Sequence, residues 1–115
     1  MSPAAKAQRD PGGAVPDLAL VGRMARGDQE ALGELRSRYA ATMYALAFGL
    51  LSNPPDAEHV LSETFLEAWR CAATFEPQLG TVHSWLAEIA RRRARSLARA
   101  PETGRATVRV RFHTG

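Results

Sequence analysis

Residues 31–51 read ALGELRSRYAATMYALAFGLL and carry the clearest helical pattern in the chain. Large apolar side chains recur there at steps of three, four, four, three and four residues: Leu32, Leu35, Tyr39, Met43, Leu46 and Leu50. An amphipathic helix repeats its buried face with this spacing. We therefore expect a helix that begins after Asp28 and stops at the cluster Ser52, Asn53, Pro54 and Pro55.

Three further helices are predicted around this one. The first covers residues 17–26, with Asp17 as a candidate N-cap and Gly27 as a candidate stop. Another covers residues 54–74, where Asn53 can cap the helix. The last covers residues 81–100 and ends at Pro101. The sequence thus predicts an all-α fold, a small four-helix bundle over residues 17–100, with Leu35 and Leu61 in its core.

The two ends of the chain are predicted to be tails. Residues 1–16 are rich in Ala, Pro and Gly, which favours a disordered tail. Residues 101–115 form a basic tail, in which Val108, Val110 and Phe112 alternate with arginines. That alternation could form a short edge strand, but a lone strand is unstable, so we favour a disordered or loosely docked tail.

Composition excludes several classes of protein. The chain has 115 residues, 45% of them apolar, and a single cysteine, Cys71, so it cannot form an internal disulfide or a multi-cysteine zinc site. No apolar run is long enough to span a membrane or to serve as a secretory signal, which predicts a cytoplasmic location. The histidines His59, His83 and His113 lack metal-ligand spacing. We expect no metal, no cofactor and no catalytic residues, and therefore no enzyme.

Charge is distributed unevenly along the chain. Residues 1–90 hold seven Lys or Arg and eleven Asp or Glu, whereas residues 91–115 hold eight Arg and only Glu102. This asymmetry fits a polyanionic partner for the basic end, and it equally fits a solubilising tail.

Two predicted helices carry surfaces that could bind partners. On residues 54–74, Leu66 lies within a polar arc. It is either an isolated exposed leucine or the centre of a face that docks on another helix. That arc contains Glu58, His59, Ser62, Glu63, Glu67 and Arg70. On residues 81–100, one side carries Arg91, Arg92, Arg95 and Arg99, offset only by Glu88, while Arg93 points toward the apolar arc. This stripe suits phosphate binding, or it is a solvated basic face.

Two aromatic residues lie next to this stripe. Trp85 sits at the boundary between the polar and apolar faces, which is most typical of a core tryptophan. Phe75, in the loop FEPQLG at residues 75–80, could stack on an unpaired base or simply pin the loop.

Several motifs, in order, resemble region two of the extracytoplasmic-function (ECF) sigma factors of bacterial RNA polymerase. DLALVGRMARGD at 17–28, ALGEL at 31–35 and RY at 38–39 are similar to its first part. DAEHVLSETFLEAW at 56–69 resembles the polymerase-docking helix. FEPQLG at 75–80, SWL at 84–86 and IAR at 89–91 resemble the promoter-melting loop and helix.

The resemblance implies two interfaces and no chemistry by the chain itself. A helix like residues 54–74 docks on the clamp coiled coil of the largest polymerase subunit, which implies polymerase-binding roles for Glu58, His59, Ser62, Glu63, Leu66 and Arg70. The loop and last helix hold the non-template strand of the promoter −10 element, with a base flipped into a pocket of the loop. The implied DNA-binding residues are Phe75, Gln78, His83, Arg91, Arg92, Arg95 and Arg99.

The sequence departs from the family pattern at four positions. His59 and Ser62 replace the usual Asp and Gln of the docking helix, and Arg92 and Ser96 replace the usual Asn and Asp of the melting helix. Nothing after Pro101 resembles the family's second helix-turn-helix domain. Two functions remain open: a promoter-binding sigma module, or an interaction module that binds the polymerase clamp or an anti-sigma factor without promoter activity.

Overall fold

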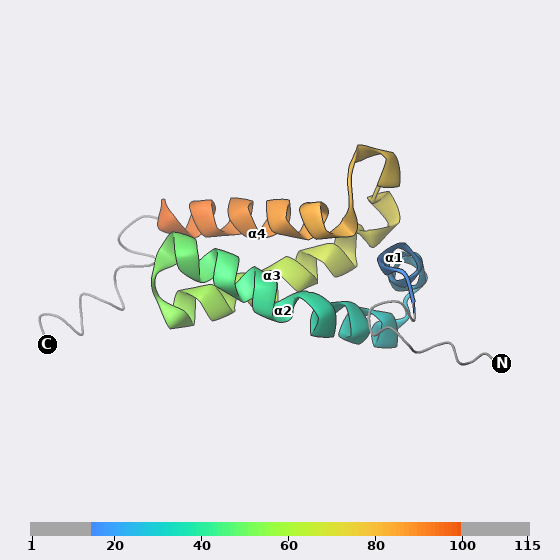
Figure 1. The fold of residues 1–115 in the computed structure, drawn as a ribbon, viewed down its shortest axis with the longest axis horizontal. Helices are drawn as coiled ribbons and strands as arrows, with labels where there is room; N and C mark the ends of the chain where they lie inside the picture. Colours follow the sequence, from blue (N-terminus) through green and yellow to red (C-terminus); the bar gives the residue numbers. More distant parts are fainter. Residues whose placement is uncertain (1–14, 100–115) are drawn as a thin grey trace, which may run out of the picture.

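The computed structural model describes residues 15–99, which contain four α-helices and no strand (Figure 1). The helices are α1 (Asp17–Ala25), α2 (Gln29–Leu51), α3 (Pro54–Cys71) and α4 (Val82–Ala98), and two 3₁₀ turns, η1 (Ala72–Thr74) and η2 (Pro77–Leu79), connect α3 to α4. The predicted all-α fold is confirmed. The predictions for the two tails concern residues that the structure does not describe, apart from Val15 and Pro16. They include the candidate strand at 106–112 and the expectation that no second domain follows Pro101.

The junction between α1 and α2 is closed by local hydrogen bonds. The Gly27 N–H donates to the Met24 carbonyl at 2.9 Å, and the Asp28 N–H donates to the Arg23 carbonyl at 3.0 Å. This is the Schellman pattern, and Gly27 adopts the positive φ of 90° that it requires. The Asp28 carboxylate then accepts from the N–H of Ala31 and so starts α2, as the sequence predicts.

Two helix ends differ from the prediction. Asp17 is the first residue of α1 and not its cap, because its carboxylate accepts hydrogen bonds from Arg38 and Tyr39 of α2. Helix α3 ends at Cys71, and the next three residues tighten into η1, where the Thr74 hydroxyl donates to the Cys71 carbonyl at 2.8 Å.

The helices are arranged so that α3 is antiparallel to both of its neighbours. Only Ser52 and Asn53 join α2 to α3, and Asn53 caps α3 by accepting from the Asp56 N–H at 3.0 Å. Helix α4 returns along the pair in the direction of α2, while α1 is seen end-on beside the start of α2 (Figure 1). The loop of η1 and η2 therefore lies at the same end of the bundle as α1.

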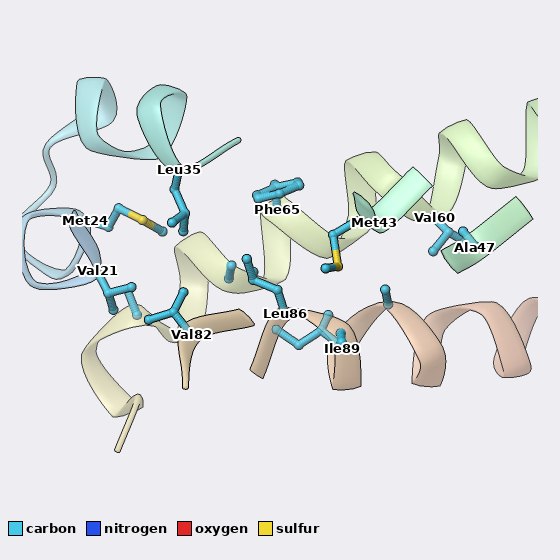
Figure 2. Close-up of a cluster of buried hydrophobic side chains, with 14 of the residues drawn as sticks. Val21, Met24, Leu35, Met43, Ala47, Val60, Phe65, Val82, Leu86 and Ile89 are labelled. Atoms are coloured by element: carbon cyan, nitrogen blue, oxygen red, sulfur yellow. The ribbon is translucent and has the colours of Figure 1, made fainter. Parts of the chain in front are cut away.

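Buried apolar side chains from all four helices form one core, with Phe65 of α3 near its middle (Figure 2). Leu35 and Met43 of α2 and Leu86 of α4 are fully buried close to it. The predicted burial of Leu35 is confirmed. Leu61 is only half-buried at the edge of this core, and its neighbour Val60 takes the buried position instead.

The buried face of α2 winds around the helix. Its buried residues are Ala31, Leu35, Met43, Ala47 and Leu51, which are spaced by multiples of four. Since four residues turn an α-helix by about 400°, such a stripe rotates by about 40° per step. The rotation lets α2 pack on α1 near its start and on α3 and α4 farther along. It also moves Leu50, predicted to be on the apolar face, to a position that is 49% exposed.

Leu35→Ala should lower the free energy of unfolding by about 2–5 kcal/mol, because it leaves a cavity at a fully buried site. Leu50→Ala removes the same atoms from the surface of the same helix and should cost less than about 1 kcal/mol. Urea unfolding followed by circular dichroism measures both values. Equal losses in the two variants would contradict the assigned core.

Candidate functional site

The four arginines of the predicted stripe lie in different environments on α4. Arg95 and Arg99 are exposed, and neither forms an ion pair with another residue in the range 15–99. Arg91 pairs weakly with Glu88, at 3.7 Å, on its own helix. Arg92 pairs with Glu67 of α3 at 3.0 Å. The stripe is therefore partly neutralised in the folded chain: by Glu88, as the sequence predicts, and also by Glu67 from the neighbouring helix.

An ion cluster connects α4 to α3. The Arg93 Nε donates to Glu67 at 2.8 Å, the Arg93 Nη1 donates to Glu63 at 3.1 Å, and Arg92 donates to both carboxylate oxygens of Glu67. Arg93 was expected to point toward the apolar arc, and Glu67 was expected on the open polar arc. Both instead meet at the α3–α4 contact, where only 15% of the Glu67 side chain is exposed.

The ion cluster changes the pKa of Glu67. Burial by itself would raise the pKa of this carboxyl, but the hydrogen bonds from Arg93 and Arg92 outweigh it and hold the pKa below its ordinary value. The carboxylate is thus charged in the folded state at neutral pH, and it carries two guanidinium partners.

A hollow of about 540 Å³ opens between the η1–η2 loop and the start of α4. Phe75 and Trp85 form its aromatic wall, with ring centroids 4.8 Å apart and planes tilted by 51°. Trp85 is half-buried against the core, as predicted, and one side of it still faces the hollow. The hollow is lined by Thr74, Phe75, Glu76, Leu79, Gly80, Thr81, Ser84, Trp85 and Glu88. Gln78 is exposed on the loop and is not part of this lining.

The edge of the hollow is fixed by the cap of α4. The Thr81 hydroxyl accepts from the Ser84 N–H at 3.0 Å, and the Ser84 hydroxyl accepts from the Thr81 N–H at 3.1 Å, which forms a capping box. Gly80 precedes it, and a Cβ there would lie 2.9 Å from the Ser84 oxygen. Only glycine fits this position without displacing the cap.

His83, another predicted DNA contact, is exposed on the first turn of α4 and packs on Tyr39 of α2, with ring centroids 5.6 Å apart. The Tyr39 hydroxyl donates to Asp17, which also accepts from Arg38 at 2.8 Å. Burial and this bond to Asp17 raise the pKa of Tyr39 to about 12. The contact thus ties α1, α2 and the start of α4 together.

The predicted polymerase-binding face lies on the outer side of α3. Leu66 is 42% exposed at its centre. The exposed predicted residues around it are Glu58, His59, Ser62 and Arg70. Glu63 is half-buried and engaged with Arg93, so it belongs to the ion cluster as much as to this face.

Leu66 also borders a shallow groove of about 330 Å³ between α2 and α3, which we call the α2–α3 groove. Its other lining residues are Gln29, Leu32, Gly33, Arg36 and Trp69. The Arg36 guanidinium lies 5.5 Å from the centre of the Phe65 ring and covers one side of the core. The α2 residues of this groove were absent from the predicted site. Leu32 was assigned to the buried face of its helix but is only half-buried, and nothing in the sequence of α2 distinguishes it from the core residues.

The described residues were searched for metal-binding clusters and for membrane-spanning helices. In the stretch from Val15 to Arg99, no three His, Cys, Asp or Glu side chains are grouped so that they could hold a metal ion. No helix of that stretch is long and apolar enough to cross a membrane.

The comparisons with known proteins agree with this architecture. The family model described as sigma-70 region 2 matches residues 35–102, more than half of the chain. The chain belongs to the sigma-70 region 2 family, and its similarity to ECF relatives supports the ECF type of that domain.

The curated relatives are proteins named ECF RNA polymerase sigma factor SigK. That of Mycolicibacterium vanbaalenii is 34% identical over 76 residues, which cover 66% of this chain and 39% of the relative. That of Mycobacterium ulcerans is 32% identical over 95 residues, covering 82% and 51%. That of Mycobacterium tuberculosis is 33% identical over 86 residues, covering 75% and 46%. The matched part of this chain thus spans about half or less of each relative.

Glu67→Gln should lower the free energy of unfolding by about 1–3 kcal/mol near neutral pH, because it removes the negative charge that two guanidinium groups share and replaces one acceptor oxygen by an amide donor. The folded pKa of Glu67 is depressed below the ordinary 4.5. Its contribution is therefore present above that pH and lost as the pH falls through the folded pKa. Urea unfolding between about pH 7 and pH 3 should show the difference from wild type shrinking on acidification.

The control is Glu58→Gln, which makes the same charge change at an exposed α3 position with no ion pair among the described residues. It should move stability by less than about 0.5 kcal/mol at any of these pH values. A pH-independent difference between Glu67→Gln and wild type would contradict the ion cluster.

Proposed function

We propose that this chain is the module of an ECF sigma factor that docks on core RNA polymerase and holds the promoter −10 element. One observation carries the proposal: the same bundle has an exposed leucine beside the α2–α3 groove and an aromatic hollow at the start of α4, the helix whose far end carries the unpaired Arg95 and Arg99. Family membership gives both surfaces a partner. In this role the chain forms and breaks no covalent bond, and it works in the cytoplasm, where the polymerase is.

The polymerase would dock on the outer side of α3. Leu66 would insert into the clamp coiled coil of the largest subunit, with Leu32 and Trp69 of the α2–α3 groove extending the apolar contact. Exposed charged residues such as Glu58 and Arg70 would form the solvated rim of the interface. His59 and Ser62 replace a carboxylate and an amide of the family pattern, so we expect fewer charged bonds at that rim.

The non-template strand of the −10 element would follow α4. Arg95 and Arg99 would contact phosphates directly, because no described residue neutralises them. A base turned out of the strand would enter the hollow and stack on Phe75 and Trp85. Gln78 of the loop and His83 of the first turn of α4 are exposed but lie outside the lining of the hollow, so any contact that they make would be with neighbouring nucleotides.

A second candidate function is an interaction module that binds the polymerase clamp or an anti-sigma factor without acting at promoters. The pairing of Arg91 with Glu88 and of Arg92 with Glu67 favours it, since it halves the positive charge available for phosphates. The salt dependence of DNA binding distinguishes the two functions.

Leu66→Arg should abolish binding to core RNA polymerase, because it places a charge at the centre of a surface that must lose water on docking. Its thermal stability should remain close to wild type, since Leu66 faces solvent. Leu50→Arg makes the same change at a similarly exposed leucine of α2 and should bind normally. Binding to purified core enzyme measured by fluorescence anisotropy checks this expectation. Retained affinity in Leu66→Arg would exclude α3 as the docking surface.

Arg95→Gln combined with Arg99→Gln should weaken binding to single-stranded DNA and reduce the log–log salt slope by roughly 1.4, at about 0.7 per lost phosphate contact. Arg92→Gln should change the slope less, because Arg92 is already paired with Glu67. Affinities measured from about 50 to 300 mM salt test both variants. The loss should be similar for −10-like and scrambled strands, since phosphate contacts carry no sequence information. Salt-independent binding by wild type would instead favour the interaction module.

A further inference from the structure

The second half of α2 is apolar on all of its sides. Residues 43–51 read MYALAFGLL, and the stretch 39–55 contains no Asp, Glu, Lys or Arg. A helix of this composition is normally buried all round. Here α3 and α4 cover the side that carries Met43, Ala47 and Leu51, while α1 lies beside the start of α2 (Figure 1). Among the described residues, no helix covers the opposite side, which we call the outer face of α2.

The outer face of α2 carries two ridges of large side chains. One ridge is Tyr44 and Phe48, whose rings stack with centroids 6.2 Å apart and planes tilted by 13°. The other is Leu46 and Leu50. Phe48 is 40% exposed and Leu50 is 49% exposed. The exposed residues between the ridges are small: Ala41, Ala45 and Gly49. A Cβ placed on Gly49 would meet no described atom within 4 Å, so the space above this face is open.

Charge indicates what can cover this face. A partner that brought charged side chains against it would strip them of water and offer them no opposite charge. The partner must therefore be uncharged over about three turns of helix, and the same face of a second copy meets this condition. Residues 15–99 hold ten Arg and ten Asp or Glu, so the net charge of +3 lies outside this range. Two bundles therefore have no net charge that would oppose their approach.

The shape of the face also allows it to pair with itself. In a two-fold dimer the same patch serves both copies. Small side chains along the middle let two α2 helices approach closely, because the distance between packed helices depends on the side chains at their contact. The ridges on either side would then bury the exposed parts of Phe48 and Leu50 against the other copy. Stacking on Tyr44 already orders the Phe48 ring, which lowers the entropy cost of association.

We propose that the outer face of α2 is a self-association surface, on which a second copy of this chain packs its own α2 in a two-fold dimer. One helix face buries little area, so we expect weak association, with a Kd on the order of 100 µM. This inference goes beyond the proposed function and does not depend on it. Ala45 follows Arg36 by nine residues, which is about two and a half turns, so the outer face points away from the α2–α3 groove. A dimer therefore leaves the proposed polymerase surface open.

Sedimentation equilibrium of the full 115-residue chain, from about 10 µM to 1 mM, tests the proposal. Wild type should show a monomer–dimer equilibrium. Ala45→Arg should raise its Kd at least about tenfold, because it places two like charges in the middle of the contact. Arginine is nearly as good a helix former as alanine, so the circular dichroism spectrum should not change. The control Ala19→Arg makes the same change at an exposed position of α1 and should leave the Kd as in wild type.

Leu50→Arg is the second variant, and it keeps the test valid if Ala45→Arg fails to fold. It should raise the dimer Kd as well, while its binding to core RNA polymerase stays normal. Salt gives an independent readout, since the outer face holds no charged residue. The Kd of wild type should therefore change little between about 50 and 500 mM salt.

Three results would overturn the inference. In the first, wild type stays monomeric at about 1 mM, and the face is then covered by another part of the chain or by a different apolar protein. In the second, a dimer forms that Ala45→Arg and Leu50→Arg both leave intact. In the third, the dimer dissociates as salt is raised, which means that charged residues hold it together. None of these results concerns polymerase or DNA binding, so the proposed function would stand.

Discussion

The ion cluster between α3 and α4 is the constraint on which the functional surfaces depend. Helix α4 buries Leu86 and Ile89 in its first half, but beside Arg92 and Arg93 its buried residues are the small Ala90 and Ala94, so apolar contact is slight at this level of the helix. Arg92 and Arg93 add a directional link to Glu63 and Glu67. Because the hollow lies between the loop that leaves α3 and the first turns of α4, its width depends on this same contact.

The ion cluster also links the two proposed interfaces, because it joins α3 to α4. Glu63 and Leu66 are three residues apart on α3, and Glu63 is bonded to Arg93 of α4. A partner that draws Glu63 outward on one side therefore alters the charge around Arg92 and Arg93 on the other.

The local features of the fold could be predicted from the sequence, while the features made between helices could not. The cap at Asn53, the start of α2 after Asp28 and the exposure of Leu66 follow from spacing within one segment. The winding stripe of α2 was not predicted, because a helical wheel assumes one straight buried face. The helices that pack on α2 determine where its buried face turns.

The candidate site shows the same division. Phe75 and the arginines were predicted as site residues from residue type and position, and their DNA-binding role stays a prediction. The pairing of Glu67 with Arg92 spans 25 residues on two helices, and nothing within either helix indicates it. The α2 side of the docking groove was missed for the same reason, since Leu32 reaches Trp69 only after α2 and α3 have packed.

The capping box at Thr81 and Ser84 has a consequence for how a base could enter the hollow. These two residues are at once the end of the loop and the first turn of α4, so the loop cannot swing aside as a flap without unwinding the helix start. The backbone of the loop is therefore held in place, and access to the hollow depends on the side chains around its opening. Leu79 is 80% exposed and is the apolar lining side chain with room to rotate, whereas Phe75 packs on Trp85. In the proposed function, a base would therefore enter after side-chain rotation, on the fast timescale of side chains, and not through a slow conformational gate.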